Sequence, residues 1–267
     1  MPQDNDLYQR YYDWFTGYAK DYINQAESSV TPAFELKLTH TLNVVKESLW
    51  LSQNSQFSNY DLQLAGIIGL LHDIGRFPQL QRYQTFNDRV SCNHAVLSLS
   101  VIRNKHLLAA LPPQDRQIIQ TAVIWHNQKD LPASLPPRLF QFAGLIRDAD
   151  KLDIFRVLLT EYATHDPARI QTVDLDLPEG EDCSQSLLEA ITSGRMGDAA
   201  DVQSRLDLHL VRLSWVFVFH NPAAALRRFQ AHAYFDQYRP YLPDAPRVQK
   251  ALAFLQDYVD KAIQQTK

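Results

Sequence analysis

The chain has 267 residues, of which 45% are hydrophobic and 21% are charged, and its formal net charge is −4. This balance excludes a disordered chain and argues against a surface for duplex nucleic acid, because the 26 basic residues are scattered among 30 acidic ones. The first residues lack the basic and apolar segments of a secretory signal, and no run of about 18 apolar residues predicts a membrane span. We therefore expect a globular, cytoplasmic protein that does not bind a membrane.

Apolar residues recur at helical spacing along nearly the whole chain, which predicts an all-α fold. A helix that begins at an N-cap, Asp61, is expected to end near Gly75 and Pro78. The expected helices cover residues 7–25, 35–51, 61–75, 94–104, 114–128, 138–162, 204–220 and 245–265.

Several of the segments between these helices contain proline or glycine. Residues 81–92 are expected to form a loop, and residues 165–201 are expected to be an irregular lid or linker. We expect one domain for the whole chain, with a core of about residues 34–160 and an extension of C-terminal helices over about residues 200–267.

Asp148 lies on an apolar helix face, with Leu145, Leu152 and Phe155 at helical spacing. Burying a carboxylate costs several kcal/mol unless a positive group lies beside it. Two interpretations stay open: a core carboxylate that pairs with Arg147 or Lys151, and a ligand of a bound cation.

Histidines raise the same question on three other predicted helices. His40, His94 and His126 each share a face with apolar residues, and each of them taken alone is explained by a hydrogen-bonded core histidine. His72 and Asp73 end the very apolar run AGIIGLL, which predicts a buried helix, so this pair needs a partner. One cation, with further ligands from neighbouring helices, would meet that need.

The ordered set of His40, His72-Asp73, His94, His126 and Asp148 resembles the H…HD…H…H…D signature of the HD superfamily. The resemblance covers about residues 34–160, and the stretch HDIGRFPQLQRYQTFNDRVSCNHA is similar to bacterial HD phosphohydrolases. It implies an all-α helical bundle with a metal centre.

The resemblance also implies a ligand assignment. His40, His72, Asp73 and Asp148 would hold one metal, and His94 and His126 would hold a second, with Asp73 as a bridge. The nitrogen and oxygen ligands suit Mn, Fe, Co, Ni or Zn better than Mg.

The implied activity is hydrolysis of a phosphomonoester or phosphodiester of a small, nucleotide-like substrate by metal-activated water. Asp73, Arg76 and Lys151 are the expected catalytic residues. The expected substrate contacts are Arg76, Lys151, Arg147 and Asn127, although surface or salt-bridging roles remain open for the cations.

Two other functions remain open. The same six residues are similar to the ligands of diiron oxygenases of the superfamily, because His and Asp ligands suit both Lewis-acid and redox chemistry. A regulatory module that binds a metal or ligand is the third interpretation, and the complete ligand set argues against it. The sequence does not predict the oligomeric state.

Overall fold

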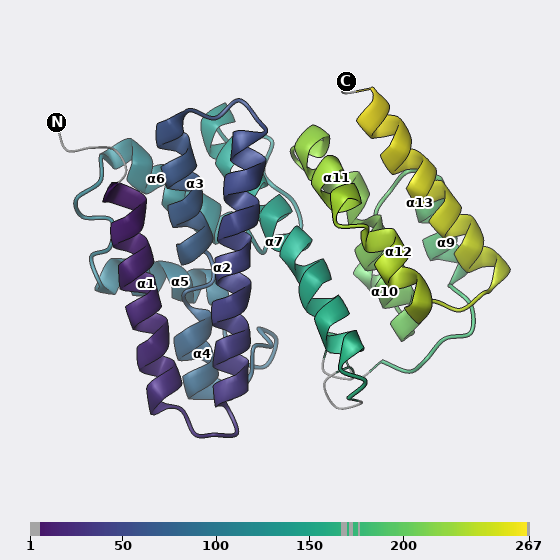
Figure 1. The fold of residues 1–267 in the computed structure, drawn as a ribbon, viewed down its shortest axis with the longest axis horizontal. Helices are drawn as coiled ribbons and strands as arrows, with labels where there is room; N and C mark the ends of the chain where they lie inside the picture. The colour runs from purple at the N-terminus through teal and green to yellow at the C-terminus, as the bar shows by residue number, and fades with distance from the viewer. Residues whose placement is uncertain (1–5, 167–169, 171–172, 176, 266–267) are drawn as a thin grey trace. The chain divides into compact units, whose positions relative to one another are not determined.

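The computed structural model describes residues 6–166, 170, 173–175 and 177–265, and it divides into two compact units (Figure 1). The first unit is Met1–Asp153 and the second is Ile154–Lys267. The described residues form helices and no strand, which confirms the predicted all-α class. That the whole chain acts as one domain stays a prediction.

The first unit is built from long helices whose starts and ends mostly match the apolar periodicity. In Figure 1, α1, α2 and α3 run side by side, and each contacts the other two. The helices are α1 (Asp6–Gln25), α2 (Thr31–Gln53), α3 (Asn59–Leu71), α4 (Arg76–Tyr83), α5 (His94–Asn104), α6 (Pro113–Trp125) and α7 (Pro137–Ala163), and the boundary between the units falls within α7.

The segment around α3 and α4 differs from the expectation in two ways. Ser58, and not Asp61, is the N-cap of α3, and Asp61 completes a capping box by accepting the Ser58 backbone N–H. The helical pattern also does not run through to Gly75: α3 ends at Leu71, a turn follows, and α4 includes residues 81–83 of the predicted loop.

An aromatic cluster joins α1, α2 and α4. Phe77 contacts Phe15, Tyr18, Tyr22 and Phe34, with ring centroids 5.7–6.0 Å apart. Phe15 and Phe77 are fully buried. Because Phe77 lies in the first turn of α4, this cluster fixes the short helix and with it the turn at residues 72–75.

The second unit contains shorter helices around its own aromatic core. Phe155 contacts Phe229, Tyr234 and Tyr238 there. Besides the end of α7, its helices are α9 (Gln185–Thr192), η1 (Ala199–Asp201), α10 (Arg205–Leu213), η2 (Ser214–Val218), α11 (Pro222–Ala231), α12 (Tyr234–Tyr238), η3 (Arg239–Tyr241) and α13 (Pro246–Gln264).

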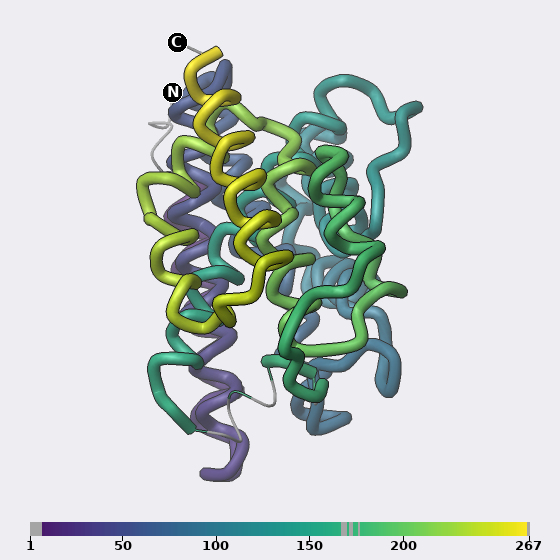
Figure 2. The backbone as a smooth tube through the Cα atoms, turned by 90° about the vertical axis from the view of Figure 1, so that its right-hand side faces the viewer, coloured from purple at the N-terminus to yellow at the C-terminus, as the bar shows by residue number. Residues whose placement is uncertain are grey.

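Several of these helices were not expected. The segment at 165–201, predicted to be irregular, contains α9 and η1, and the sequence pattern did not predict α11 or α12. In Figure 2, α13 runs beside α11, which it contacts. Residues 170 and 173–175 of the predicted lid or linker are helical or in a turn, whereas residues 167–169, 171–172 and 176 lie outside the described residues.

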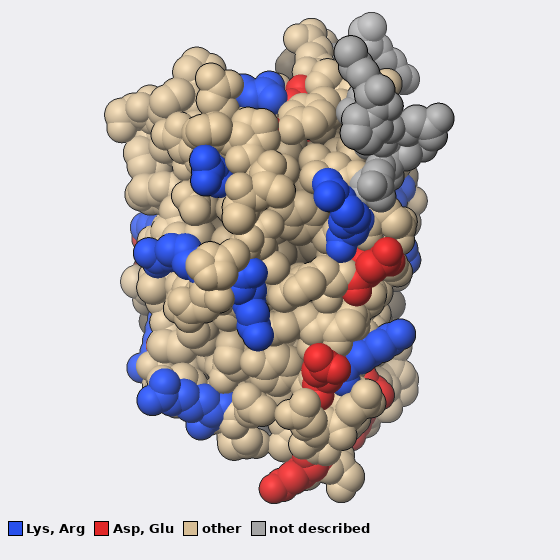
Figure 3. All heavy atoms as spheres, turned by 90° about the vertical axis from the view of Figure 1, so that its left-hand side faces the viewer, with Lys and Arg blue, Asp and Glu red and all other residues tan. Residues whose placement is uncertain are grey.

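The charge distribution agrees with the composition. On the face drawn in Figure 3, Lys and Arg side chains stand apart from one another and are separated by uncharged surface, without a continuous basic stripe. Among the described helices, none has the length and apolar character needed to cross a membrane.

Gly75 offers a test of the close packing at this turn. A Cβ at Gly75 would lie 2.5 Å from the Ser98 backbone N and 2.6 Å from the His94 backbone O, so α5 would have to move. We expect Gly75→Ala to lower the free energy of unfolding by about 1–3 kcal/mol in urea denaturation.

Gly17→Ala is the matched control, since an added Cβ there has nothing within 4 Å. In the middle of α1, alanine should leave stability unchanged or raise it by up to about 1 kcal/mol. Equal stability of the two variants would contradict the close contact at Gly75.

Candidate metal centre

The turn between α3 and α4 carries His72 and Asp73 at the centre of the first unit. His72 has no solvent exposure and Asp73 is 3% exposed. The His72 backbone N–H still closes the last turn of α3 on the Ile68 carbonyl oxygen, and the Arg76 N–H closes the turn on the Asp73 carbonyl oxygen. Both side chains are therefore held by a backbone with little freedom.

The two carboxylate oxygens of Asp73 face two different pairs of histidines. Oδ2 lies 3.4 Å from His72 Nε2 and 3.7 Å from His40 Nε2. Oδ1 lies 3.3 Å from His94 Nε2 and 3.5 Å from His126 Nε2. The histidines come from α2, the α3–α4 turn, the start of α5 and the end of α6, so four segments meet at one carboxylate.

Asp150 of α7 completes the pair formed by His40 and His72. Its Oδ1 lies 3.2 Å from His40 Nε2 and 4.0 Å from His72 Nε2. Two clusters of candidate ligand atoms result, in each of which all atoms lie within 4.8 Å of one another: His40, His72 and Asp150, and Asp73, His94 and His126.

Each of the four imidazoles uses its Nδ1 in a hydrogen bond away from Asp73. The Nδ1–H groups of His72 and His126 donate to the backbone carbonyls of Gly69 and Val123, at 2.8 and 2.7 Å. A carbonyl oxygen can only accept, so these two Nδ1 atoms carry the proton. In a neutral ring of this tautomer, Nε2 presents a bare lone pair.

The other two imidazoles are oriented by carboxylates. His40 Nδ1 donates to Asp153 Oδ2 at 2.7 Å, and His94 Nδ1 donates to Asp88 Oδ2 at 2.6 Å. Such outer carboxylates fix the ring orientation of metal-binding histidines. All four Nε2 atoms are therefore free to face the same small volume.

The pKa shifts favour the neutral forms of His72 and His94 and the ionised form of Asp73. Burial lowers the pKa of His72 and of His94, and the nearby charge of Asp73 only partly offsets this. For His40, burial and the charge of Lys37 also lower the pKa. Hydrogen bonds to Asp150 and Asp153 outweigh both effects, so the pKa of His40 is raised. Burial would raise the pKa of Asp73, but the charges of Lys37, His72 and His94 lower it well below its usual range.

Two features at the centre are unfavourable without a cation. His94 Nε2 and His126 Nε2 lie 2.9 Å apart, and two lone pairs at that distance repel each other unless a cation lies beside them. His72 Nε2 and Asp73 Oδ1 are buried and have no hydrogen-bond partner among the described residues. Unsatisfied buried polar atoms are rare in native proteins.

The spacing of these atoms fits metal ligation. Nitrogen and oxygen ligands about 2.0–2.2 Å from one metal ion lie about 2.8–3.6 Å apart at neighbouring positions of octahedral or tetrahedral geometry. Four contacts within the two clusters run from 2.9 to 3.5 Å, and all ligand atoms of a cluster lie within 4.8 Å of one another. These buried His and Asp groups can bind metal ions, and Asp73 offers one oxygen to each cluster.

The structure corrects one predicted ligand. It brings together His40, His72, Asp73, His94 and His126, but Asp150 and not Asp148 lies beside His40. Residues two positions apart on a helix point about 200° apart, so α7 can direct only one of the two carboxylates to the centre. Asp148 is fully buried, and its charge acts on Arg147 and Lys151, as in the alternative interpretation.

Two cations flank Asp73, one on each oxygen. Arg76 Nε lies 3.6 Å from Oδ1, as expected for a residue predicted to be at the site. Lys37, which the sequence analysis missed, forms an ion pair with Oδ2. Lys37 lies three residues before His40 on α2, and residues i and i+3 share a helix face, so this spacing could have predicted that Lys37 lies near the site. The Lys37 and Arg76 side chains are 15% and 16% exposed, so both are accessible from outside.

The other residues predicted to contact the substrate have different surroundings. Arg147 is 6% exposed and donates to backbone carbonyls at and after the end of α6, including those of Trp125 at 2.9 Å and Lys129 at 2.8 Å. It therefore closes the C-terminus of α6 behind His126, and its predicted substrate contact stays a prediction. Lys151 donates to the Arg147 carbonyl oxygen at 3.4 Å, and burial lowers its pKa to about 8. Asn127 donates to Asn93. Substrate contacts of Lys151 and Asn127 stay predictions.

Asp88 and Asp153 allow the two clusters to be tested separately, since each orients one histidine of a different cluster. We expect Asp88→Asn to weaken metal binding at the cluster of His94, and Asp153→Asn to weaken it at the cluster of His40. Loss of such an outer carboxylate lowers affinity by about 10–100-fold.

The measurement is a calorimetric titration of chelator-treated protein with Mn²⁺ or Co²⁺, and each variant is the control for the other. Weakening of the same binding event in both variants, or of neither event, would contradict the assignment of the two carboxylates.

Comparison with known proteins agrees with this geometry. Searches of curated proteins and of solved structures found no match. A family model, the HD domain, matches residues 38–154, a range that includes both clusters. Residues 38–154 therefore match an HD domain, which is typical of a superfamily of metal-dependent hydrolase type.

Proposed function

We propose that the chain is a metal-dependent phosphohydrolase that cleaves a phosphomonoester or phosphodiester of a small, nucleotide-like substrate. The observation that carries the proposal is the convergence of four imidazole Nε2 atoms on the two oxygens of Asp73, with Asp150 beside His40. His40, His72 and Asp150 would hold one divalent metal, His94 and His126 would hold a second, and Asp73 would offer one oxygen to each.

The donor set supports Mn, Fe, Co, Ni or Zn over Mg, because imidazole nitrogen suits these ions. When bound, the metals would lower the pKa of water and withdraw charge from a phosphoryl group. The histidines contribute through their Nδ1 hydrogen bonds, which orient the rings and leave Nε2 to face the metals. Asp73 contributes by staying ionised, as its lowered pKa indicates.

Lys37 and Arg76 are the proposed phosphoryl-binding cations. A phosphoryl transition state carries charge on its equatorial oxygens, and cations beside it stabilise that charge. The two side chains stand on opposite oxygens of Asp73, one beside each cluster. Arg76 is held there by Asp88 and by the Phe86 carbonyl oxygen, to which its Nη1 donates.

The limited exposure of these groups supports a small substrate. Asp150 has a side-chain exposure of 20%, and Lys37 and Arg76 have less. A phosphoryl group at the end of a small molecule can approach such a centre, whereas a base-paired duplex is too wide.

The activity test uses protein purified without air and supplied with Mn²⁺, Co²⁺, Ni²⁺ or Fe²⁺. We expect phosphate release from nucleoside monophosphates or other small phosphate esters, and loss of that activity with chelator or in Asp73→Ala. Oxygen consumption with iron and no phosphate release would overturn the hydrolase assignment in favour of an oxygenase.

Lys37→Met tests the cation at Oδ2. We expect kcat/KM to fall by about 10²–10³-fold, because charge stabilisation in the transition state is lost, while the metal content is unchanged. Lys46→Met, on the same helix but with its Nζ bound to Asn43 at the surface, is the control and should retain full activity. Full activity of Lys37→Met would contradict the role of Lys37.

A further inference from the structure

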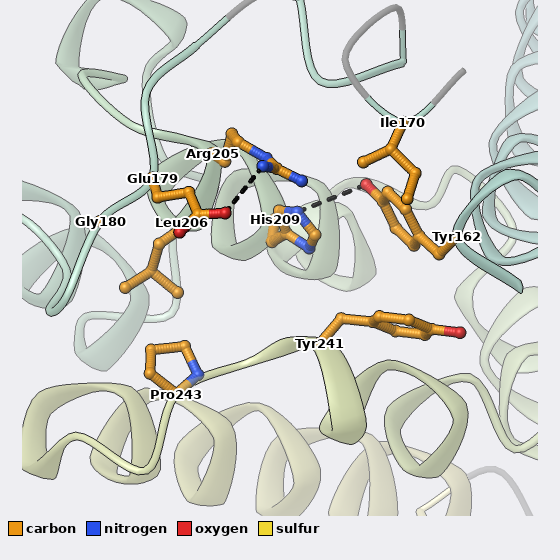
Figure 4. A pocket seen from close by; sticks show the side chains of 9 residues that line it. All are labelled: Tyr162, Ile170, Glu179, Gly180, Arg205, Leu206, His209, Tyr241 and Pro243. Carbon is orange, nitrogen blue, oxygen red and sulfur yellow. Dashed lines mark hydrogen bonds and ion pairs between the residues drawn. The ribbon is translucent and has the colours of Figure 1, made fainter. Parts of the chain in front are cut away.

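The second unit contains a cavity of about 290 Å³ that includes no residue of the candidate metal centre (Figure 4). Tyr241, Pro243 and Leu206 give it an apolar wall, and Arg205 and His209 give it a polar one. All of its lining residues belong to the unit Ile154–Lys267. Its volume is at the small end of the range typical of ligand pockets.

The polar wall rests on a buried carboxylate, Asp174, which has no solvent exposure. Asp174 accepts from the Tyr162 hydroxyl at 2.6 Å, from Arg205 Nε at 2.9 Å and from Arg212 Nη1 at 3.3 Å. Two guanidinium groups thus share one buried carboxylate. Because Asp174 is already shared with Arg212, it neutralises Arg205 only in part, which leaves Arg205 able to bind an anion.

Arg205 still has bonding capacity on the cavity side. Its Nη1 donates to Glu179 Oε1 at 3.1 Å, but the Glu179 side chain is 88% exposed. Such an exposed ion pair is worth little because water screens it. An anionic group entering the cavity can therefore replace Glu179 on Arg205, and Figure 4 shows this pair at the cavity edge.

His209 supplies an unsatisfied acceptor at the same wall. The Tyr162 hydroxyl donates its own proton to Asp174, so at 3.4 Å it accepts from His209 Nε2–H. His209 Nδ1 is then a lone pair, and it is buried without a hydrogen-bond partner among the described residues. The ring of Tyr162 stacks on His209, with centroids 5.1 Å apart, and tilts against Tyr241 at 5.0 Å.

We infer that this cavity binds a small anion that carries a planar ring, with the anionic group on Arg205 and the ring against Tyr241. Nucleoside monophosphates and aromatic carboxylates share this chemistry. A ligand group with an N–H or O–H would also satisfy His209 Nδ1. The cavity is separate from the candidate metal centre, so this inference does not depend on the proposed hydrolysis.

Calorimetric titration of the full-length chain tests the inference, with AMP, phenylacetate and inorganic phosphate as probes. We expect AMP or phenylacetate to bind more tightly than phosphate, which lacks the ring. Arg205→Gln should weaken this binding by about tenfold or more, the usual effect of losing one charge-assisted hydrogen bond. Which of the two ring-bearing probes binds identifies the class of anion.

Glu179→Gln is the sharper variant, because it removes an exposed competitor for Arg205 and cannot unfold the core. It should tighten binding of the ring-bearing probe, whereas Arg247→Gln, a change of another exposed arginine of this unit, should leave it unchanged. Asp73→Asn should leave the part of the binding that depends on Arg205 unchanged, which separates this site from the metal centre.

Three results would overturn the inference. The first is the absence of saturable binding of both ring-bearing probes at millimolar concentration. The second is an affinity that neither Glu179→Gln nor Arg205→Gln changes. The third is loss, in Asp73→Asn, of the binding that depends on Arg205.

Discussion

A single buried carboxylate, Asp73, sets the requirements that the first unit meets. It is almost fully buried, and its two oxygens face four imidazole Nε2 atoms that carry no proton when the rings are neutral. Burying a charge together with unpaired acceptors is costly unless a cation is present. Lys37 and Arg76 contribute positive charge at the edges, and divalent metals between the oxygens and the imidazoles would satisfy the centre.

The helices around Asp73 serve mainly to hold ring orientations. Backbone carbonyls fix two of the histidines, and Asp88 and Asp153 fix the other two. Arg147 closes the backbone after α6, which keeps His126 in place, and the contact of Gly75 with α5 keeps the α3–α4 turn close to His94. The orientation of a ligand thus depends on residues that never touch a metal.

Much of this could be predicted from the sequence, because long helices have a strong apolar period and polar residues on their apolar faces stand out. His40, His94 and His126 were found in this way, and the HD pair followed from the very apolar run before it. The apolar pattern predicts less where a short turn changes the direction of the chain, as the turn after Leu71 does in place of the expected helix. It also does not fix the rotation of α7, because both Asp148 and Asp150 have apolar neighbours at helical spacing. The choice between these two carboxylates depends on that rotation.

Residues that act through another side chain could also not be predicted from the apolar pattern. Asp88 lies in a loop, and only folding brings it to His94, so spacing along the chain carries no signal. The second unit shows the same limit: α9, α11 and α12 are short, and tertiary packing rather than propensity stabilises such helices. The Asp174 network joins residues from α7, the segment after it and α10.

The metal content of each chain is the sharpest test of the two-metal centre, measured by elemental analysis after reconstitution and removal of free metal. We predict two divalent ions in the wild-type protein, two in Asp148→Asn, and fewer in Asp150→Asn. A wild-type protein that retains no metal would contradict it, and so would loss of metal in Asp148→Asn with full retention in Asp150→Asn.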